Sequence, residues 1–141
     1  MLSERIAMAS ISAIRTIRQG EATKLRKGKV RTTEALLDQA STRRGRADIS
    51  ARTGIATTEL LKWAHQADLM RVKGVGAEYA DLLAASGVDT IKALRRRNSQ
   101  NLMASFTQIN SRRRRVQRLP TVEMVQGWIE AASDLEPAVT S

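Results

Sequence analysis

The sequence predicts an all-α protein, and three observations support that prediction. Apolar residues recur at spacings of three and four along most of the chain, which is the period of a helix face. Alternating runs of strand formers are scarce, and aromatic residues make up only 3% of the chain. Ser, Thr or Asn precedes most of the periodic segments, as expected of helix N-caps. With 141 residues, 42% of them apolar, the chain suits about nine to ten short helices around a shared core.

The expected helices follow from these caps and periods. A first helix is predicted over residues 2–13, with Ser3 as N-cap. Threonines at 32, 42 and 57 open the next three helices, and Asp89-Thr90, Asn98 and Pro120-Thr121 open later ones. The predicted spans are 33–39, 44–52, 57–70, 77–86, 90–96, 98–110 and 122–132. The acidic stretch 133–141 is expected to be a flexible tail.

An internal duplication is indicated by a fixed offset of 58 residues. Matching residues at this offset continue over more than 20 positions, which favours two pseudo-repeats. The matched pairs are Ile14 with Val72, Ile17 with Val75, Ala22 with Ala80, Leu25 with Leu83, Val30 with Val88 and Thr32 with Thr90. We therefore expect a first half at 1–70 and a second at 71–132, packed as one compact unit with no flexible linker.

The most informative stretch is Val72-Lys73-Gly74-Val75-Gly76-Ala77, between two predicted helices. Two glycines one residue apart allow a tight reversal that brings backbone N–H groups to the surface. The start of the next helix adds further unpaired N–H groups and the positive end of its dipole. The stretch could hold one phosphate, or it could serve only to pack two helices.

Residues 72–83 resemble the helix-hairpin-helix motif of DNA-repair and DNA-processing proteins. The resemblance implies that this hairpin, Lys73 to Ala77 with Val75 at its centre, holds a DNA backbone phosphate through the amides of Lys73, Gly74, Gly76 and Ala77 and the ammonium of Lys73. Two features depart from this pattern. Thr16 and Arg18 replace the glycines in the first copy, so its amides are less suited to a phosphate. Glu78 and Asp81 in the second copy would repel one.

Positive charge is concentrated in clusters. The net charge is +10, with 18 arginines against 6 lysines, and basic residues gather at 24–31, 43–52 and 95–118. Arginine's planar fork suits phosphate recognition, although crowded basic loops in a merely soluble protein would give the same composition. The candidate nucleic-acid contacts from these clusters and from the first hairpin are Arg18, Arg43, Arg44, Arg112, Arg113, Arg114 and Arg115.

A wider resemblance covers residues 14–131. The blocks that carry it include residues 53–55, 60–64, 67–76, 79–83, 87–90 and 118–120, together with Trp128-Ile129. They resemble the family of small tandem helix-hairpin-helix proteins known as domain of unknown function 4332. This resemblance implies a SAM-like bundle of paired helical hairpins and no established activity.

Several function classes are disfavoured by composition. The chain has no cysteine, one histidine, His65, and carboxylates scattered through helices, so we expect no enzyme, metal site or cofactor. No membrane association and no small-molecule ligand is expected, and the location expected is cytoplasmic. Few aromatic residues are present to stack bases. The leading interpretation is sequence-independent binding to the duplex DNA backbone. The alternative is a helical protein-interaction module that no longer binds DNA and whose arginines meet an acidic protein partner.

Overall fold

The computed structural model describes residues 9–140 and confirms the all-α prediction for that part of the chain. It contains eight α-helices, the 3₁₀-helix η2 (Ile11–Ala13) and no strand beyond an isolated bridge between Ser10 and Thr32. The helices are α1 (Gln19–Lys27), α2 (Thr33–Ala40), α3 (Arg43–Thr53), α4 (Thr57–Leu69), α5 (Ala77–Ala85), α6 (Ile91–Arg95), α7 (Ser99–Arg112) and α8 (Val122–Ser133).

Most helix starts are set by the caps that the sequence predicted. The side chains of Thr32, Thr42, Thr90, Asn98 and Thr121 each accept a hydrogen bond from a first-turn amide. Helix α4 differs, because its N-cap is Ala56 and Thr57 lies inside the helix. The helix predicted over 2–13 falls largely outside the described residues, and its described end forms η2 rather than an α-helix.

Two segments 58 residues apart have the same local backbone geometry. Helices α1 and α5 are both nine residues long and begin at positions 19 and 77. After each, the chain turns through a residue of positive φ, Lys29 at 69° and Gly87 at 86°. Val30 N then donates to Leu25 O, and Val88 N to Leu83 O, both at 2.8 Å. Helices α2 and α6 follow at the same offset, with starts at 33 and 91.

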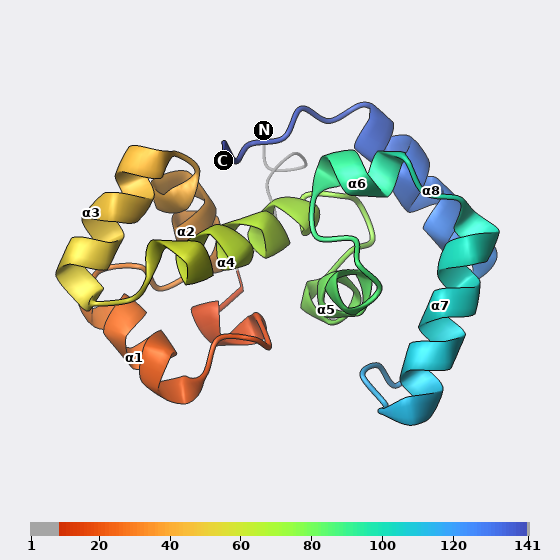
Figure 1. Cartoon of the computed structure of the whole chain (residues 1–141), viewed down its shortest axis with the longest axis horizontal. Coiled ribbons are helices and arrows are strands. Elements are labelled where there is room, and N and C mark those ends of the chain that lie inside the picture. Colours follow the sequence, from red (N-terminus) through yellow and green to blue (C-terminus); the bar gives the residue numbers. More distant parts are fainter. Residues whose placement is uncertain (1–8, 141) are drawn as a thin grey trace.

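The buried side chains form two apolar clusters joined by α4. The first cluster lies among η2 and α1 to α4 and includes Trp63, while the second lies among α5 to α8 and includes Phe106 and Trp128. Figure 1 shows α4 running from one lobe to the other, with α3 and α7 at opposite ends of the long axis. Leu69, at the end of α4, belongs to the second cluster, and Met70 packs against both.

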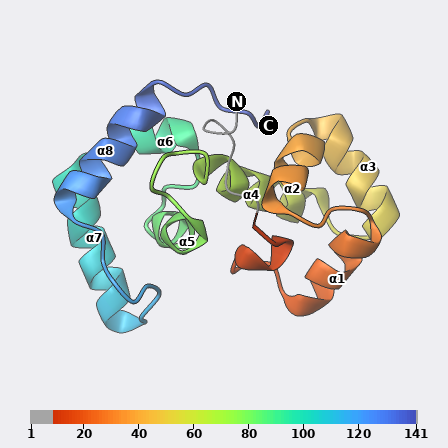
Figure 2. The same cartoon turned by 180° about the vertical axis from the view of Figure 1, so that it is seen from behind.

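The C-terminal segment packs against both lobes. Residues 133–141 were expected to be a flexible tail, but Ala138 N donates to the buried carboxylate of Asp68 and Thr140 N donates to Ser41 O. Val139 is buried in the first cluster. Figures 1 and 2 show this segment returning from α8 towards the first lobe. The expectation missed this packing because the anchoring groups lie about 70 and 99 residues away in the sequence.

Candidate nucleic-acid interface

The turn between α4 and α5 is held by two buried valines. Val72 and Val75 point into the second apolar cluster, and Val75 N donates to Val72 O at 3.0 Å. Gly74, between them, has φ +91°, a conformation that glycine adopts without a Cβ penalty. Lys73, Gly74 and Gly76 are exposed. The valines therefore hold the turn to the core while its backbone faces solvent.

The amides of this turn lack partners within the described chain. Among the hydrogen bonds of residues 9–140, none is donated by the backbone N–H of Lys73, Gly74, Gly76 or Ala77. Gly76 is the N-cap of α5 and has no side chain with which to cap the first turn. Exposed, unpaired amides at a helix start are the donors that the sequence analysis expected here.

Trp128 of α8 packs against Gly74 on the buried side of the turn. A Cβ atom placed on Gly74 would lie 3.0 Å from Trp128 Nε1, whereas a Cβ on Gly76 would meet no atom within 4 Å. The Trp128 ring is 2% exposed and packs against Tyr79 of α5, with ring centroids 5.1 Å apart. Gly74 is thus required by packing as well as by φ, while Gly76 faces open space.

The two carboxylates at the start of α5 are both paired with arginine. Glu78 Oε1 lies 3.0 Å from Arg15 Nη2, and Asp81 Oδ2 lies 3.2 Å from Arg115 Nη1. From the sequence alone, both acids are expected to repel a phosphate. Pairing with arginine offsets that repulsion and places two guanidinium groups beside the helix start.

The arginine loop, residues 113–118, is fixed by a side chain of α7. Asn110 Oδ1 accepts hydrogen bonds from Arg115 N at 2.7 Å and Val116 N at 3.1 Å. Val116 is buried, and the hydroxyl of Tyr79 donates to Arg118 O at 3.1 Å. These contacts hold the loop against the side of α5.

The arginines of this region differ in their roles. Arg115 is partly buried and paired, and Arg114 Nη2 donates to Gln117 O at 3.2 Å. Arg112, at the end of α7, and Arg113 are exposed, and no hydrogen bond or ion pair of their side chains occurs within residues 9–140. The structure therefore brings Arg113, Arg114 and Arg115 together beside Asp81 of α5.

Arg15, which the sequence did not mark as a candidate contact, also lies beside α5. It lies on the loop before α1, contacts Glu78, and donates through Nη1 to the backbone oxygen of Arg115. At the offset of 58, Arg15 occupies the position of Lys73. That correspondence could have marked it as a candidate.

Other predicted contacts do not join this site. Arg18 is exposed at the N-cap of α1, three residues after Arg15. Arg43 and Arg44 are exposed on the first turn of α3, at the opposite end of the molecule from α7 (Figure 1). The neighbouring Arg46 is buried and donates to Ala40 O and Thr140 O, so its charge serves the packing of the tail.

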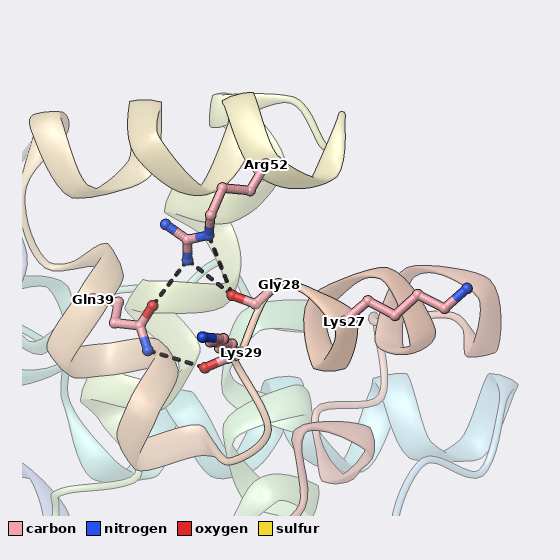
Figure 3. Close-up of a pocket in the computed structure, with 5 residues that line it drawn as sticks. All are labelled: Lys27, Gly28, Lys29, Gln39 and Arg52. Atoms are coloured by element: carbon pink, nitrogen blue, oxygen red, sulfur yellow. Dashed lines mark hydrogen bonds between the residues drawn. The ribbon is translucent and has the colours of Figure 1, made fainter.

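A second basic region surrounds the turn between α1 and α2 (Figure 3). A pocket of about 500 Å³ is lined by Lys27, Gly28, Lys29, Gln39 and Arg52. Arg52 donates to Gly28 O through Nε and Nη2 and to Gln39 Oε1, and Gln39 donates to Lys29 O. Figure 3 shows the Lys27 side chain directed away from Arg52. These contacts tie α3 and α2 to the turn, so Arg52 has a structural role.

Neither a metal-binding cluster nor a membrane-spanning helix is present among the described residues. Across residues 9–140, no three His, Cys, Asp or Glu side chains gather in an arrangement able to hold a metal ion. None of the helices in the same range combines the length and the apolar composition that crossing a bilayer requires.

Comparison with known proteins identifies a family match over most of the chain. The model of a family described as "Domain of unknown function (DUF4332)" matches residues 15–135. Neither the curated proteins nor the solved structures gave a match.

Proposed function

We propose that this chain, which belongs to the DUF4332 family of domains of unknown function, is a tandem helix-hairpin-helix protein that binds the backbone of duplex DNA without reading its sequence. The observation that supports the proposal most directly is the exposed turn at 73–77. Its four unpaired amides lie at the start of α5, a helix whose Glu78 and Asp81 are paired with Arg15 and Arg115. Amides at a helix start are well suited to donating hydrogen bonds to the oxygens of one phosphate.

The tandem arrangement is supported by the agreement of the two segments 58 residues apart. Equal helix lengths, equal cap hydrogen bonds and matching positive φ angles favour two copies of one unit. Thr32 and Thr90, for example, both accept from an amide three residues later at 3.0 Å. In this proposal the second copy supplies backbone donors and the first supplies side-chain charge.

Duplex rather than single-stranded nucleic acid is favoured by the burial of the aromatic rings. Trp63, Trp128 and Phe106 are all buried, with at most 2% of each residue exposed. Tyr79 is partly buried and packs against Trp128. Binding of single strands depends on exposed rings on which bases stack, whereas the contacts available here are amides and guanidinium groups.

The alternative of a protein-interaction module drew its support from Glu78 and Asp81. Both carboxylates are paired with arginines of the same chain, so they no longer count against a phosphate. The net charge of +10 would still suit an acidic protein surface. The two functions differ in the binding experiment that follows.

The proposal is tested by measuring binding to a labelled duplex of about 20 base pairs at several salt concentrations. With about five to eight phosphates contacted, log affinity should fall against log salt with a slope of roughly −4 to −7, independently of sequence. Replacing Arg112, Arg113 and Arg114 together by Gln should make the slope shallower by about 2 to 3. The absence of binding at about 50 mM salt would refute the proposal and leave the protein-interaction module.

A further inference from the structure

We propose that the pocket between the loop before α1, helix α5 and the arginine loop binds a terminal phosphate monoester. The source of that phosphate is the end of a polynucleotide chain, and this part of the inference rests on the proposed function. We call this hollow the arginine pocket. It is lined by Arg15, Thr16, Asp81, Arg113, Arg114 and Arg115.

The arginine pocket is built from segments far apart in the sequence. Arg15 and Thr16 precede α1, Asp81 lies on α5, and the other arginines come from the loop after α7. Arg15 donates a hydrogen bond through Nη1 to the backbone oxygen of Arg115, 100 residues later, and so joins two sides of the pocket. The arginines are therefore brought together by the tertiary fold and not by a local charge run.

Two of the guanidinium groups are held in place by carboxylates. Asp81, with a side chain only 7% exposed, holds Arg115, and Glu78 holds Arg15. A guanidinium that is already fixed in this way has little conformational freedom left to lose when it binds an anion, so the entropy cost of binding is smaller. Asp81 and Glu78 thus hold Arg115 and Arg15 in position at the edge of the pocket.

One donor of the pocket-lining arginines has no partner. Arg115 Nε is buried and forms no hydrogen bond within the described chain, although Nη1 of the same group is paired with Asp81. Buried donors are nearly always satisfied, so an unpaired one beside a hollow indicates a missing acceptor. A phosphate oxygen would supply that acceptor, and Arg113 adds an exposed guanidinium without a partner in residues 9–140.

Charge and size select the class of phosphate. Four arginines against Asp81 and Glu78 leave a formal charge of +2, which matches a phosphate monoester dianion better than a singly charged backbone diester. The pocket volume is about 360 Å³, near the lower end of the roughly 300–1,000 Å³ that small-ligand pockets occupy. A hollow of this size admits the end of a chain, whereas an uninterrupted duplex would pass across it.

The pocket itself is tested with inorganic phosphate, independently of DNA. The full chain is titrated at about pH 8 and constant ionic strength, with thermal unfolding as the readout. We expect phosphate to raise the Tm of the wild-type protein and of Arg112→Gln, whose side chain lies outside the pocket, but not that of Arg113→Gln. Neither substitution removes a contact of the described chain, so loss of folding is not expected. Equal responses of the two variants, or no response of the wild type, would overturn the inference.

The source of the phosphate is tested with duplexes that differ only at their ends. Duplexes carrying a 5′-phosphate, a 3′-phosphate or hydroxyl groups alone are compared at one salt concentration. We expect one phosphorylated end to bind about tenfold more tightly, as one or two added charge-assisted hydrogen bonds would give, and Arg113→Gln to abolish that preference. Equal binding of all three duplexes would overturn the inference while the proposed function stood. Binding of inorganic phosphate with no duplex binding would overturn the proposed function and the polynucleotide source, but would support the pocket.

Discussion

Arg115 Nη1 lies 3.2 Å from Asp81 Oδ2 and so joins the loop after α7 to helix α5, 34 residues earlier in the chain. The Asp81 side chain is 7% exposed and that of Arg115 is 32% exposed, so the pair is shielded from water on the carboxylate side. The pair between Glu78 and Arg15, one helical turn away, is 54% and 40% exposed. The two pairs look alike in the sequence, but their burial predicts different contributions to stability.

Asp81→Asn should lower the free energy of unfolding by about 1–3 kcal/mol, because Arg115 would lose the charge that offsets its partial burial. Glu78→Gln should change the free energy of unfolding by less than about 0.5 kcal/mol, since exposed ion pairs contribute little. Urea unfolding of both variants measures the difference. Equal effects of the two substitutions would show that burial does not distinguish these pairs.

The two glycines of the turn should respond differently to alanine. Gly74→Ala adds a Cβ at φ +91° and 3.0 Å from Trp128 Nε1, so we expect a loss of about 1–3 kcal/mol in stability. Gly76→Ala, at φ −90° and facing open space, should change stability by less than about 1 kcal/mol, because the lower entropy of unfolded alanine opposes its poor preference for the N-cap position.

The same pair of variants separates folding from binding. If the amides of the turn hold a phosphate, Gly76→Ala should weaken duplex binding because its methyl group occupies the open side of the turn, although the protein remains fully folded. Fluorescence anisotropy of duplex binding and circular dichroism of the same samples provide the measurements. Unchanged affinity of a folded Gly76→Ala protein would count against the amide site.

The features that the sequence predicted are those set by local chemistry. Thr32, Thr42 and Thr90 cap helices because a hydroxyl and an amide three residues apart meet whenever a helix starts there. Gly54 ends α3 with φ +77° for a similarly local reason. Periodicity therefore indicated where most helices begin and end within one or two residues.

The features that the sequence did not predict depend on contacts between distant residues. Arg15 meets Arg115 across 100 residues, and Arg46 meets Thr140 across 94. Nothing in the local pattern distinguishes the buried Arg46 from the exposed Arg44 beside it. The exposure of the turn follows from its two glycines, whereas the pairing of Arg15 with Glu78 and the distance of Arg43 and Arg44 from α7 depend on the tertiary fold.

Lys29 occupies a position at which glycine should be more stable. It has φ +69°, while the residue 58 positions later, Gly87, has φ +86°. A left-handed conformation costs a non-glycine residue about 1–2 kcal/mol, partly offset by the lower chain entropy of lysine in the unfolded state. We expect Lys29→Gly to raise the free energy of unfolding by about 0.5–1 kcal/mol.

The matched control for Lys29 is Gly87→Lys. A Cβ on Gly87 would meet no atom within 4 Å, so the effect of this substitution should come from the backbone conformation alone. It should lower the free energy of unfolding by an amount close to the gain from Lys29→Gly. Urea denaturation of both variants measures the two changes, and changes of the same sign would contradict this account.

His65 should make stability depend on pH near neutrality. Burial lowers the pKa of His65 below its ordinary value of 6.5, and the charge of Arg46 lowers it further, while Asp89 and Asp68 oppose the shift. Because the folded chain disfavours the protonated imidazole, the unfolded chain binds more protons as the pH falls through about 6.5. The stabilising contribution of the neutral ring is therefore complete above pH 6.5 and is lost as the pH falls towards the lowered pKa of the folded state. Urea unfolding between pH 7.5 and 5.5 should show a decline in stability that is smaller in His65→Gln, and parallel pH profiles for the two proteins would contradict the assignment to His65.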